Sequence, residues 1–250
     1  MRWLCFLLAS AAATAGAAAQ TAPAKTLRFD LAAIPATRDS FLFFLRGAPR
    51  GYAVWQYETR ALDMSQEVLY TAHSEFKPIE EERLRVVLNR LTGEPISSFH
   101  HIDLFNPNSD TVMVEHDLAV TRGDVIGRRR VGTRDGDVHI LPVSHTLPPE
   151  AVWSNYVLYA AAVTNLAPGD SLAVPAYREF ADSLVTLTLA AGRPTSIQVP
   201  AGRFDVLPIT SGDFVLYVTR TAPRRVVKGE TVDKSFSFEL AGSRKPIPVP

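Results

Sequence analysis

The heptapeptide Glu82-Arg-Leu-Arg-Val-Val-Leu88 decides the fold class of this chain. Successive side chains of a β-strand point to opposite faces. Its apolar side chains at positions 84, 86 and 88 therefore share one face, and the arginines at 83 and 85 share the other. This period of two predicts a strand with one buried face and one wet face, as in an antiparallel sheet.

Similar segments surround this strand and predict an antiparallel meander. Their boundaries coincide with turn residues, such as Thr92-Gly-Glu-Pro95 and Asp135-Gly-Asp137. The segments predicted before residue 122 are Phe41–Leu45, Tyr52–Thr59, Gln66–Phe76, Glu82–Leu88, Ile96–Leu104 and Thr111–Thr121. Those predicted after residue 170 are Ser171–Phe180, Ser183–Ala190, Thr195–Val199, Arg203–Ile209, Asp213–Arg220, Arg225–Val232 and Lys234–Leu240.

One segment between the two strand groups has helical spacing. Apolar residues recur at 152, 153, 156, 157, 159, 160 and 163, behind prolines in the position of a first helical turn. We therefore expect one main helix near residues 149–163. The whole pattern predicts a mainly β protein, in which residues 41–242 form a single large curved antiparallel sheet, a half-open barrel.

The first nineteen residues have the layout of a secretory signal peptide. A basic start is followed by a short apolar run and by small residues, with cleavage expected before Gln20 or at the nearby Ala15-Gly-Ala17 site. A transmembrane anchor is the alternative, but the leucine-rich run is too short for a bilayer. We therefore expect an exported protein, periplasmic or secreted, with a flexible arm over residues 20–40 and a proline-rich tail over 243–250.

Bulk composition limits the function further. Lys+Arg 26 balances Asp+Glu 26, so the chain lacks the basic excess of a nucleic-acid binder. The single cysteine, Cys5, lies in the predicted leader, so the mature chain has no thiol. No second apolar run is long enough to cross a membrane as a helix, and we expect no transmembrane segment in the mature chain.

The second half resembles a family of exported bacterial proteins of unknown function. The resemblance rests on Val199-Pro-Ala-Gly-Arg-Phe-Asp-Val206, on Leu166-Ala-Pro-Gly-Asp170 before it, and on Phe214–Val218 and Ala222–Glu230 after it. Residues 96–145 depart from that family, being long and charged. The resemblance implies the half-open barrel of the periplasmic lipoprotein-localisation factors, which holds acyl chains, and it implies no catalytic residues.

Candidate chemistry is sparse. In His100-His-Ile-Asp103, His101 and Asp103 share a strand face that His100 does not, and no spacing matches a zinc site. Ser144-His145 suggests a hydrolase, yet no nucleophile elbow or phosphate loop accompanies it. Arg128-Arg-Arg130, and Arg224-Arg225 with Lys228, either meet anionic lipid headgroups or are simply solvated. We expect no catalytic residue, no metal and no cofactor.

Aromatic and apolar residues carry the binding hypothesis. We expect the concave face to bind an apolar ligand, a lipid or lipidated cargo. The alternative is a filled core in a structural or envelope-assembly module, which docks a partner at its sheet edge or tail. The candidate ligand-binding residues are Trp55, Tyr57, Trp153, Tyr156, Phe204, Phe214, Leu216, Phe236 and Phe238.

Overall fold

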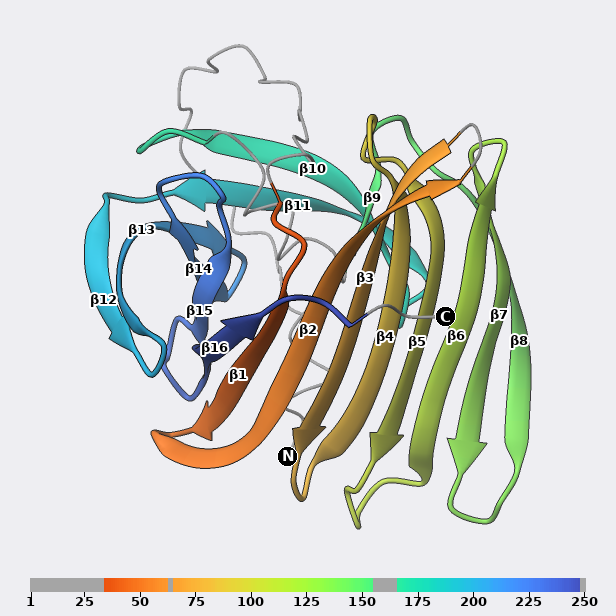
Figure 1. Cartoon of the computed structure of the whole chain (residues 1–250). Coiled ribbons are helices and arrows are strands. Elements are labelled where there is room, and N and C mark those ends of the chain that lie inside the picture. The colour runs from red at the N-terminus through yellow and green to blue at the C-terminus, as the bar shows by residue number, and fades with distance from the viewer. Residues whose placement is uncertain (1–33, 63–64, 155–165, 248–250) are drawn as a thin grey trace, which may run out of the picture.

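A computed structural model describes residues 34–62, 65–154 and 166–247 of the chain. These residues form one sixteen-stranded sheet that is not closed (Figure 1). The prediction of a mainly β protein built on a single large sheet is therefore confirmed. The described residues contain no α-helix, and no helix among them is long and apolar enough to cross a membrane.

The strands fall into two groups along the chain. The first group is β1 (Arg38–Leu45), β2 (Ala48–Leu62), β3 (Ser65–Phe76), β4 (Glu80–Asn89), β5 (Pro95–Leu104), β6 (Thr111–Thr121), β7 (Asp124–Thr133) and β8 (Val138–Thr146). The second is β9 (Val152–Trp153), β10 (Ser171–Arg178), β11 (Ser183–Ala191), β12 (Thr195–Val199), β13 (Gly202–Ser211), β14 (Phe214–Thr219), β15 (Val226–Thr231) and β16 (Phe236–Arg244).

The two groups meet where the first strand pairs with the last. Each of β1 to β7 pairs antiparallel with the next strand in the chain, and the far edge of β1 pairs with β16. The sheet continues through β15, β14, β13, β11 and β10 to β9, while β12 pairs with β13 beside this path. In Figure 1 the meander β1–β8 forms the broad right-hand part, and β12–β16 curl round at the left.

Strand β4 shows why the opening heptapeptide predicts the fold. Leu84, Val86 and Leu88 are buried, whereas Arg83 and Arg85 are exposed. The register carries the same face across neighbouring strands, because Leu84 lies opposite Ala72 of β3 and His100 of β5. We call this buried side of the meander its inner face, and the side that carries Arg83 its outer face.

An aromatic cluster joins the two groups of strands. The ring of Phe41 on β1 lies 4.2 Å from Trp55 of β2 and 5.5 Å from Phe238 of β16, between ring centroids. Phe238 in turn stacks on Phe214 of β14 at 5.9 Å. Phe43, Phe76 and Phe236 extend the cluster, with centroids between 5.6 and 5.9 Å apart.

The predicted helix near 149–163 is wrong in its described part. Residues 147–151 form a turn and a short connection, and Val152–Trp153 form β9, which pairs parallel with Ala176–Tyr177 of β10. The remaining positions from 155 onward lie outside the described residues. Apolar periodicity does not distinguish a helix from a short, fully buried strand, and both residues of β9 are buried.

Both ends of the sheet domain reach further than the predicted boundaries. Strand β1 begins at Arg38, inside the predicted arm, and Ile34 before it is already buried. Strand β16 ends at Arg244, inside the predicted tail. The backbone of Ile247 then makes two hydrogen bonds with the side chain of Gln56, at 2.5 and 3.1 Å.

Candidate functional site

The structure buries most of the predicted ligand-binding residues. The buried ones are Trp55, Tyr57, Trp153, Phe214, Leu216, Phe236 and Phe238. Phe204 is partly buried against the same core, and Tyr156 lies outside the described residues.

These residues do not form one common surface. Trp55, Phe214, Phe236 and Phe238 contact one another or the same neighbours within the aromatic cluster. Trp153 packs elsewhere, edge-on to Tyr177 of β10 at 6.0 Å. The predicted aromatics therefore mainly fill the space between strands with each other's rings.

A small pocket adjoins the aromatic cluster. Its volume is about 10 Å³, which is room for about one water molecule. It is lined by Ile34, Pro35, Thr37, Asp39, Phe41, Trp55, Tyr57, Arg224, Arg225 and Val226. Two predicted ligand-binding residues and one of the predicted arginine clusters thus converge on the same pocket.

The charges of this pocket are partly balanced. Burial raises the pKa of the Asp39 carboxyl, against the opposing effects of Ser243, Arg225 and Thr37. The nearest Arg225 nitrogen lies 3.7 Å from Asp39 Oδ1. Burial also lowers the pKa of Arg224, whose Nε donates to the carbonyl of Thr219 at 3.3 Å. Two guanidinium groups and one carboxylate leave the pocket with a positive balance.

A second polar group lies on the inner face of β4 and β5. Glu82 forms an ion pair with the buried His100, and Ser74 Oγ donates to Glu82 Oε2 at 3.0 Å. Burial alone would raise the pKa of Glu82, but the charge and hydrogen bonds of His100 and Ser74 hold it below its ordinary value. This pair is therefore an internal ion pair.

The turn after β10 covers that region of the inner face. Glu179 accepts hydrogen bonds from Ser154 at 2.8 Å and from Ser98 of β5 at 3.5 Å, and all three residues are buried. The ring of Phe180 lies edge-on to His100 at 4.3 Å and to His116 at 4.9 Å. The turn thereby fixes β10 against the middle of the meander.

His116 is the least satisfied polar residue in this interface. Its side chain is buried, and neither ring nitrogen has a hydrogen-bond partner within the described structure. Burial lowers its pKa well below the ordinary value, and the charges of His100 and Arg129 lower it further. The ring is therefore neutral at pH 7 and packs as an aromatic group.

The residues that suggested a hydrolase do not form a catalytic pair. Ser144 and His145 are neighbours on β8, so their side chains leave opposite faces of the strand. His145 Nε2 lies 2.6 Å from Asp182 Oδ1, which also accepts a hydrogen bond from Tyr177. Burial and the Asp182 hydrogen bond raise the pKa of Tyr177, so its hydroxyl keeps its proton.

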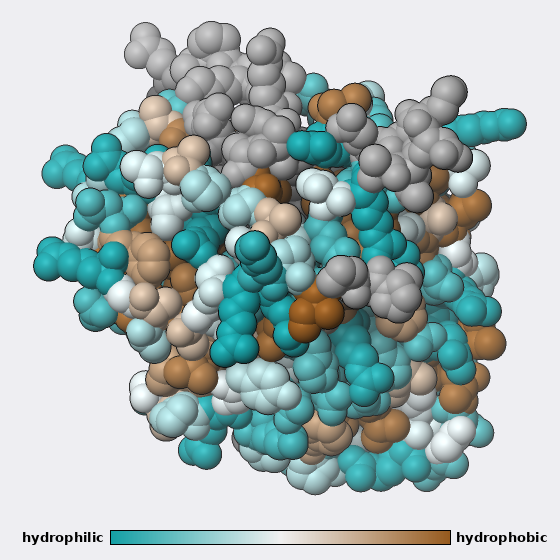
Figure 2. Space-filling view, in the orientation of Figure 1, coloured by the Kyte–Doolittle hydropathy of each residue, from teal (hydrophilic) through white to brown (hydrophobic). Residues whose placement is uncertain are grey.

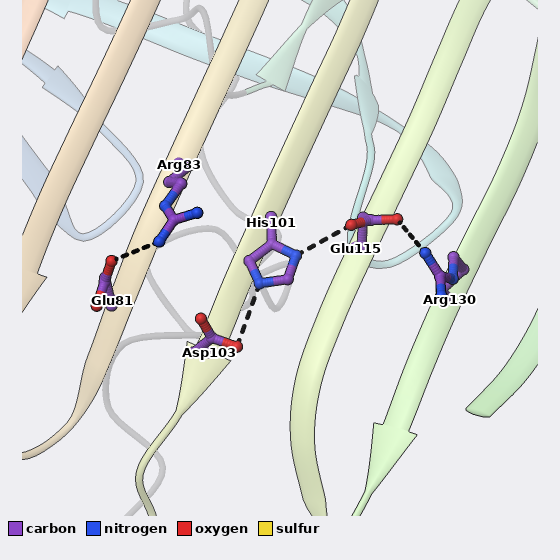
Figure 3. A network of polar contacts seen from close by, with 6 residues as sticks. All are labelled: Glu81, Arg83, His101, Asp103, Glu115 and Arg130. Carbon is purple, nitrogen blue, oxygen red and sulfur yellow. Dashed lines mark hydrogen bonds and ion pairs between the residues drawn. The ribbon is translucent and has the colours of Figure 1, made fainter. Parts of the chain in front are cut away.

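The outer face carries partly exposed polar contacts on β4 to β7 (Figure 3). His101 contacts Asp103 at 3.2 Å and Glu115 at 3.0 Å, and Glu115 binds Arg130 at 3.0 Å. The prediction that His101 and Asp103 share a face without His100 is confirmed. In the part of the chain that the structure describes, no three metal-ligating side chains are grouped so that they could hold an ion.

The exposed edge of the meander has a different character. Strand β8 is the last strand of the sheet order, and no described strand pairs with its outer edge. Hydrophobic residues lie along the right-hand side of the molecule in Figure 2, where Figure 1 places β7 and β8. The large apolar residues exposed on these two strands are Ile126, Val138, Ile140 and Leu141.

This edge was not among the predicted site residues. A sequence signal for it exists, because no charged residue occurs between Val138 and Pro149 in a chain that is 21% charged. Comparisons of the chain with family models, with curated proteins and with solved structures found no match. The resemblance to exported proteins with a half-open barrel therefore stays a prediction.

Proposed function

We propose that this protein is an exported, non-enzymatic interaction module whose β8 edge binds a partner strand. The observation that carries the proposal is the combination of an open edge with exposed apolar side chains. Ile140, on this edge strand, is 61% exposed. This proposal corresponds to the alternative of a structural or envelope-assembly module with a filled core. The contacts among the predicted ligand-binding rings support it.

The physical argument concerns how sheet edges are normally protected. Exposed edge strands usually carry charged residues, prolines, bulges or covering loops, because their free N–H and C=O groups pair readily with another strand. The nine residues of β8 include no Asp, Glu, Lys or Arg, and their register with β7 is regular, so Pro142 is the one protective residue of these kinds in the strand. Main-chain hydrogen bonds would give such a contact affinity, and alternate side chains would give it specificity.

A capture experiment tests this proposal. The wild-type chain, Ile140→Lys and Leu184→Lys are each used as bait in an envelope extract from cells that make the protein. Leu184 is also exposed, but it lies on β11, so its variant controls for surface charge. We expect Ile140→Lys alone to lose the captured component. Equal capture by all three baits would contradict binding at β8.

A second function is favoured by the pocket beside Trp55. Its apolar wall, with Arg224 and Arg225, suits an apolar ligand that carries an acidic head group, such as a lipid. A volume of about 10 Å³ does not admit an acyl chain, so binding requires the pocket walls to separate. The concave-face carrier is for this reason the second candidate.

Intrinsic fluorescence tests this second candidate. Trp153→Phe leaves Trp55 as the one tryptophan outside the predicted leader. Titration of that variant with a long-chain fatty acid would change Trp55 emission saturably if the pocket binds it, and Arg224→Gln would weaken the effect. An unchanged spectrum would rule out a carrier role for this pocket.

A further inference from the structure

We infer that the β10–β11 turn, residues 179–182, is a docking element that acid releases from the inner face of the meander, and that the ring of His116 senses the pH. The inference is independent of any partner at β8. It concerns the place where Phe180 of the turn meets two buried histidines, His100 of β5 and His116 of β6.

The first argument concerns how the turn is held. Side chains hold it on the meander, because no described strand of the meander pairs with β10 or β11. Strand β11 joins β13 through Ala190 and Ala191, at the end away from the turn. The contacts of the turn with β5, β6 and β8 come from the side chains of Glu179, Phe180 and Asp182. A turn held in this way can open locally while the sheet stays paired.

The second argument concerns His116, which lies in this contact without a polar partner. Its ring centroid is 5.3 Å from that of His100 and 4.9 Å from that of Phe180. The residue is 1% exposed, and neither ring nitrogen has a hydrogen-bond partner in the part of the chain that the structure describes. A neutral imidazole packs here as an aromatic ring. A charged imidazolium buried without a counter-ion is far more costly.

The third argument concerns the charges around His116. On its β5 side, His100 forms an ion pair with Glu82 of β4, and on its β7 side Arg129 lies opposite His116 in the register. In the turn, Glu179 accepts hydrogen bonds from two serines. The carboxylates are thus engaged elsewhere, and the charges of His100 and Arg129 lower the pKa of His116 beyond the effect of burial.

These conditions fix the direction of the pH effect. A histidine in water has a pKa of about 6.5, and the docked turn holds the pKa of His116 well below that value. Undocking exposes the ring to water, so below pH 6.5 the undocked state binds a proton that the docked state does not. The ratio of undocked to docked turn therefore rises as pH falls, by up to about tenfold per pH unit. Above pH 6.5 His116 is neutral in both states and the ratio is constant.

Two other ion pairs in this region do not account for such an effect. Asp182 of the turn contacts His145 of β8, and protonation of that histidine would strengthen the docking. Their side chains are 38% and 34% exposed, and ion pairs in that setting contribute little. The pair of Glu82 and His100 persists to below pH 4.5, because the pKa of Glu82 is lowered from that value. A release between pH 6.5 and pH 4.5 is therefore assigned to His116.

The coupling is measured by titrating the histidine rings with nuclear magnetic resonance. We expect His116 of the wild type to titrate well below pH 6.5. Phe180→Ala removes the ring that docks on His116, so it should lower the acid dissociation constant of the imidazolium at least about tenfold. Leu184→Ala, an exposed position beside the turn, is the matched control and should leave the titration unchanged. The same His116 titration in all three proteins would overturn the inference.

A spin label at residue 181 reports the release of the turn directly. Ala181 is exposed, and Cys5→Ser removes the only native cysteine, so Ala181→Cys carries a single label. We expect a mobile component of the nitroxide spectrum that grows from pH 6.5 to pH 4.5 and disappears on neutralisation. His116→Phe keeps a ring without titratable nitrogens and should abolish this growth, whereas His101→Phe, the same change on the outer face, should not. Growth that persists in His116→Phe, or its absence from the wild type, would overturn the inference.

Discussion

Gly229 on β15 shows how one absent side chain determines the packing of the aromatic cluster. A Cβ atom at this position would lie 2.4 Å from the ring of Phe238 and 2.6 Å from that of Phe214. The two rings meet over the glycine backbone because no side chain separates them. Gly229 is therefore a packing requirement of the core, although its backbone lies in an ordinary strand.

We expect Gly229→Ala to lower the free energy of unfolding by about 1–3 kcal/mol, since the aromatic rings must move to accept the methyl group. Gly242→Ala on β16 is the matched control, because a Cβ there meets nothing within 4 Å. Urea denaturation of the two variants measures the difference. A Gly229→Ala variant as stable as Gly242→Ala would show that the rings adapt without cost.

Glu80 is a residue at which burial sets a pH dependence. It is buried at the start of β4, opposite Phe76 and Leu104, and its Oε2 has no hydrogen-bond partner among the described residues. Burial, with the nearby charge of Glu82, raises its pKa from 4.5 to about 8. Between these values the folded state holds a proton that the unfolded state has lost, so stability falls as pH rises.

Glu80→Gln removes this proton linkage. We expect the stability of the variant relative to the wild type to increase between pH 5 and pH 8, by up to about 1.4 kcal/mol per pH unit, and to level off above pH 8. Chemical denaturation at several pH values measures this. Glu75→Gln is the control, because hydrogen bonds from Lys77 and Tyr52 lower the pKa of Glu75, which then titrates below this range. Parallel curves for wild type and Glu80→Gln would contradict the assignment.

At the scale of elements, alternation predicted most strands because most have one buried and one solvent-facing side. Strand β4 meets this condition at Leu84, Val86 and Leu88, although Val87, on the opposite face, is buried as well. Strands β7 and β8 do not, since β8 is exposed on both faces over most of its length. The turn at 135–137 was predicted, but the strands before and after it lacked an alternating signal.

The candidate sites were less predictable than the strands, because they depend on contacts between distant segments. Seven of the nine predicted ligand-binding residues are buried, yet the sequence does not reveal whether such residues pack on each other or line a hollow. The turn that bears Glu179 and Phe180 meets β5 and β6 more than sixty residues away in sequence. No local pattern encodes that contact. The short buried strand β9 was also missed, because its two apolar residues belong to the spacing that predicted a helix.

The docking of the β10–β11 turn can be measured as a coupling free energy. Ser154 Oγ donates to Glu179 at 2.8 Å in a buried site. We expect Ser154→Ala and Glu179→Ala to be coupled by about 1.5–3 kcal/mol, the range for a hydrogen bond to a charged group. A double-mutant cycle of unfolding free energies gives this value. Additive effects of the two substitutions would mean that the contact contributes nothing.

The two strand groups of the molecule contact each other at two places. Pairing of β1 with β16 connects the first and the last described strand into one sheet, and the aromatic cluster packs across that junction. The turn after β10 contacts the inner face of the meander at a separate location. The two strand groups are thus coupled along the sheet and across its inner face, which favours unfolding as one unit.

Two tryptophans report on these two places. Trp55 lies in the aromatic cluster, and Trp153 packs on Tyr177 near the turn that covers the meander. Trp153→Phe and Trp55→Phe therefore give one reporter for each location. In each variant we expect the urea unfolding curve measured by fluorescence to coincide with the curve measured by far-ultraviolet circular dichroism. A cooperative transition gives the same curve whichever probe is used. A fluorescence midpoint that precedes the dichroism midpoint in one variant alone would show that its location opens separately, and the strand groups would then be independent folding units.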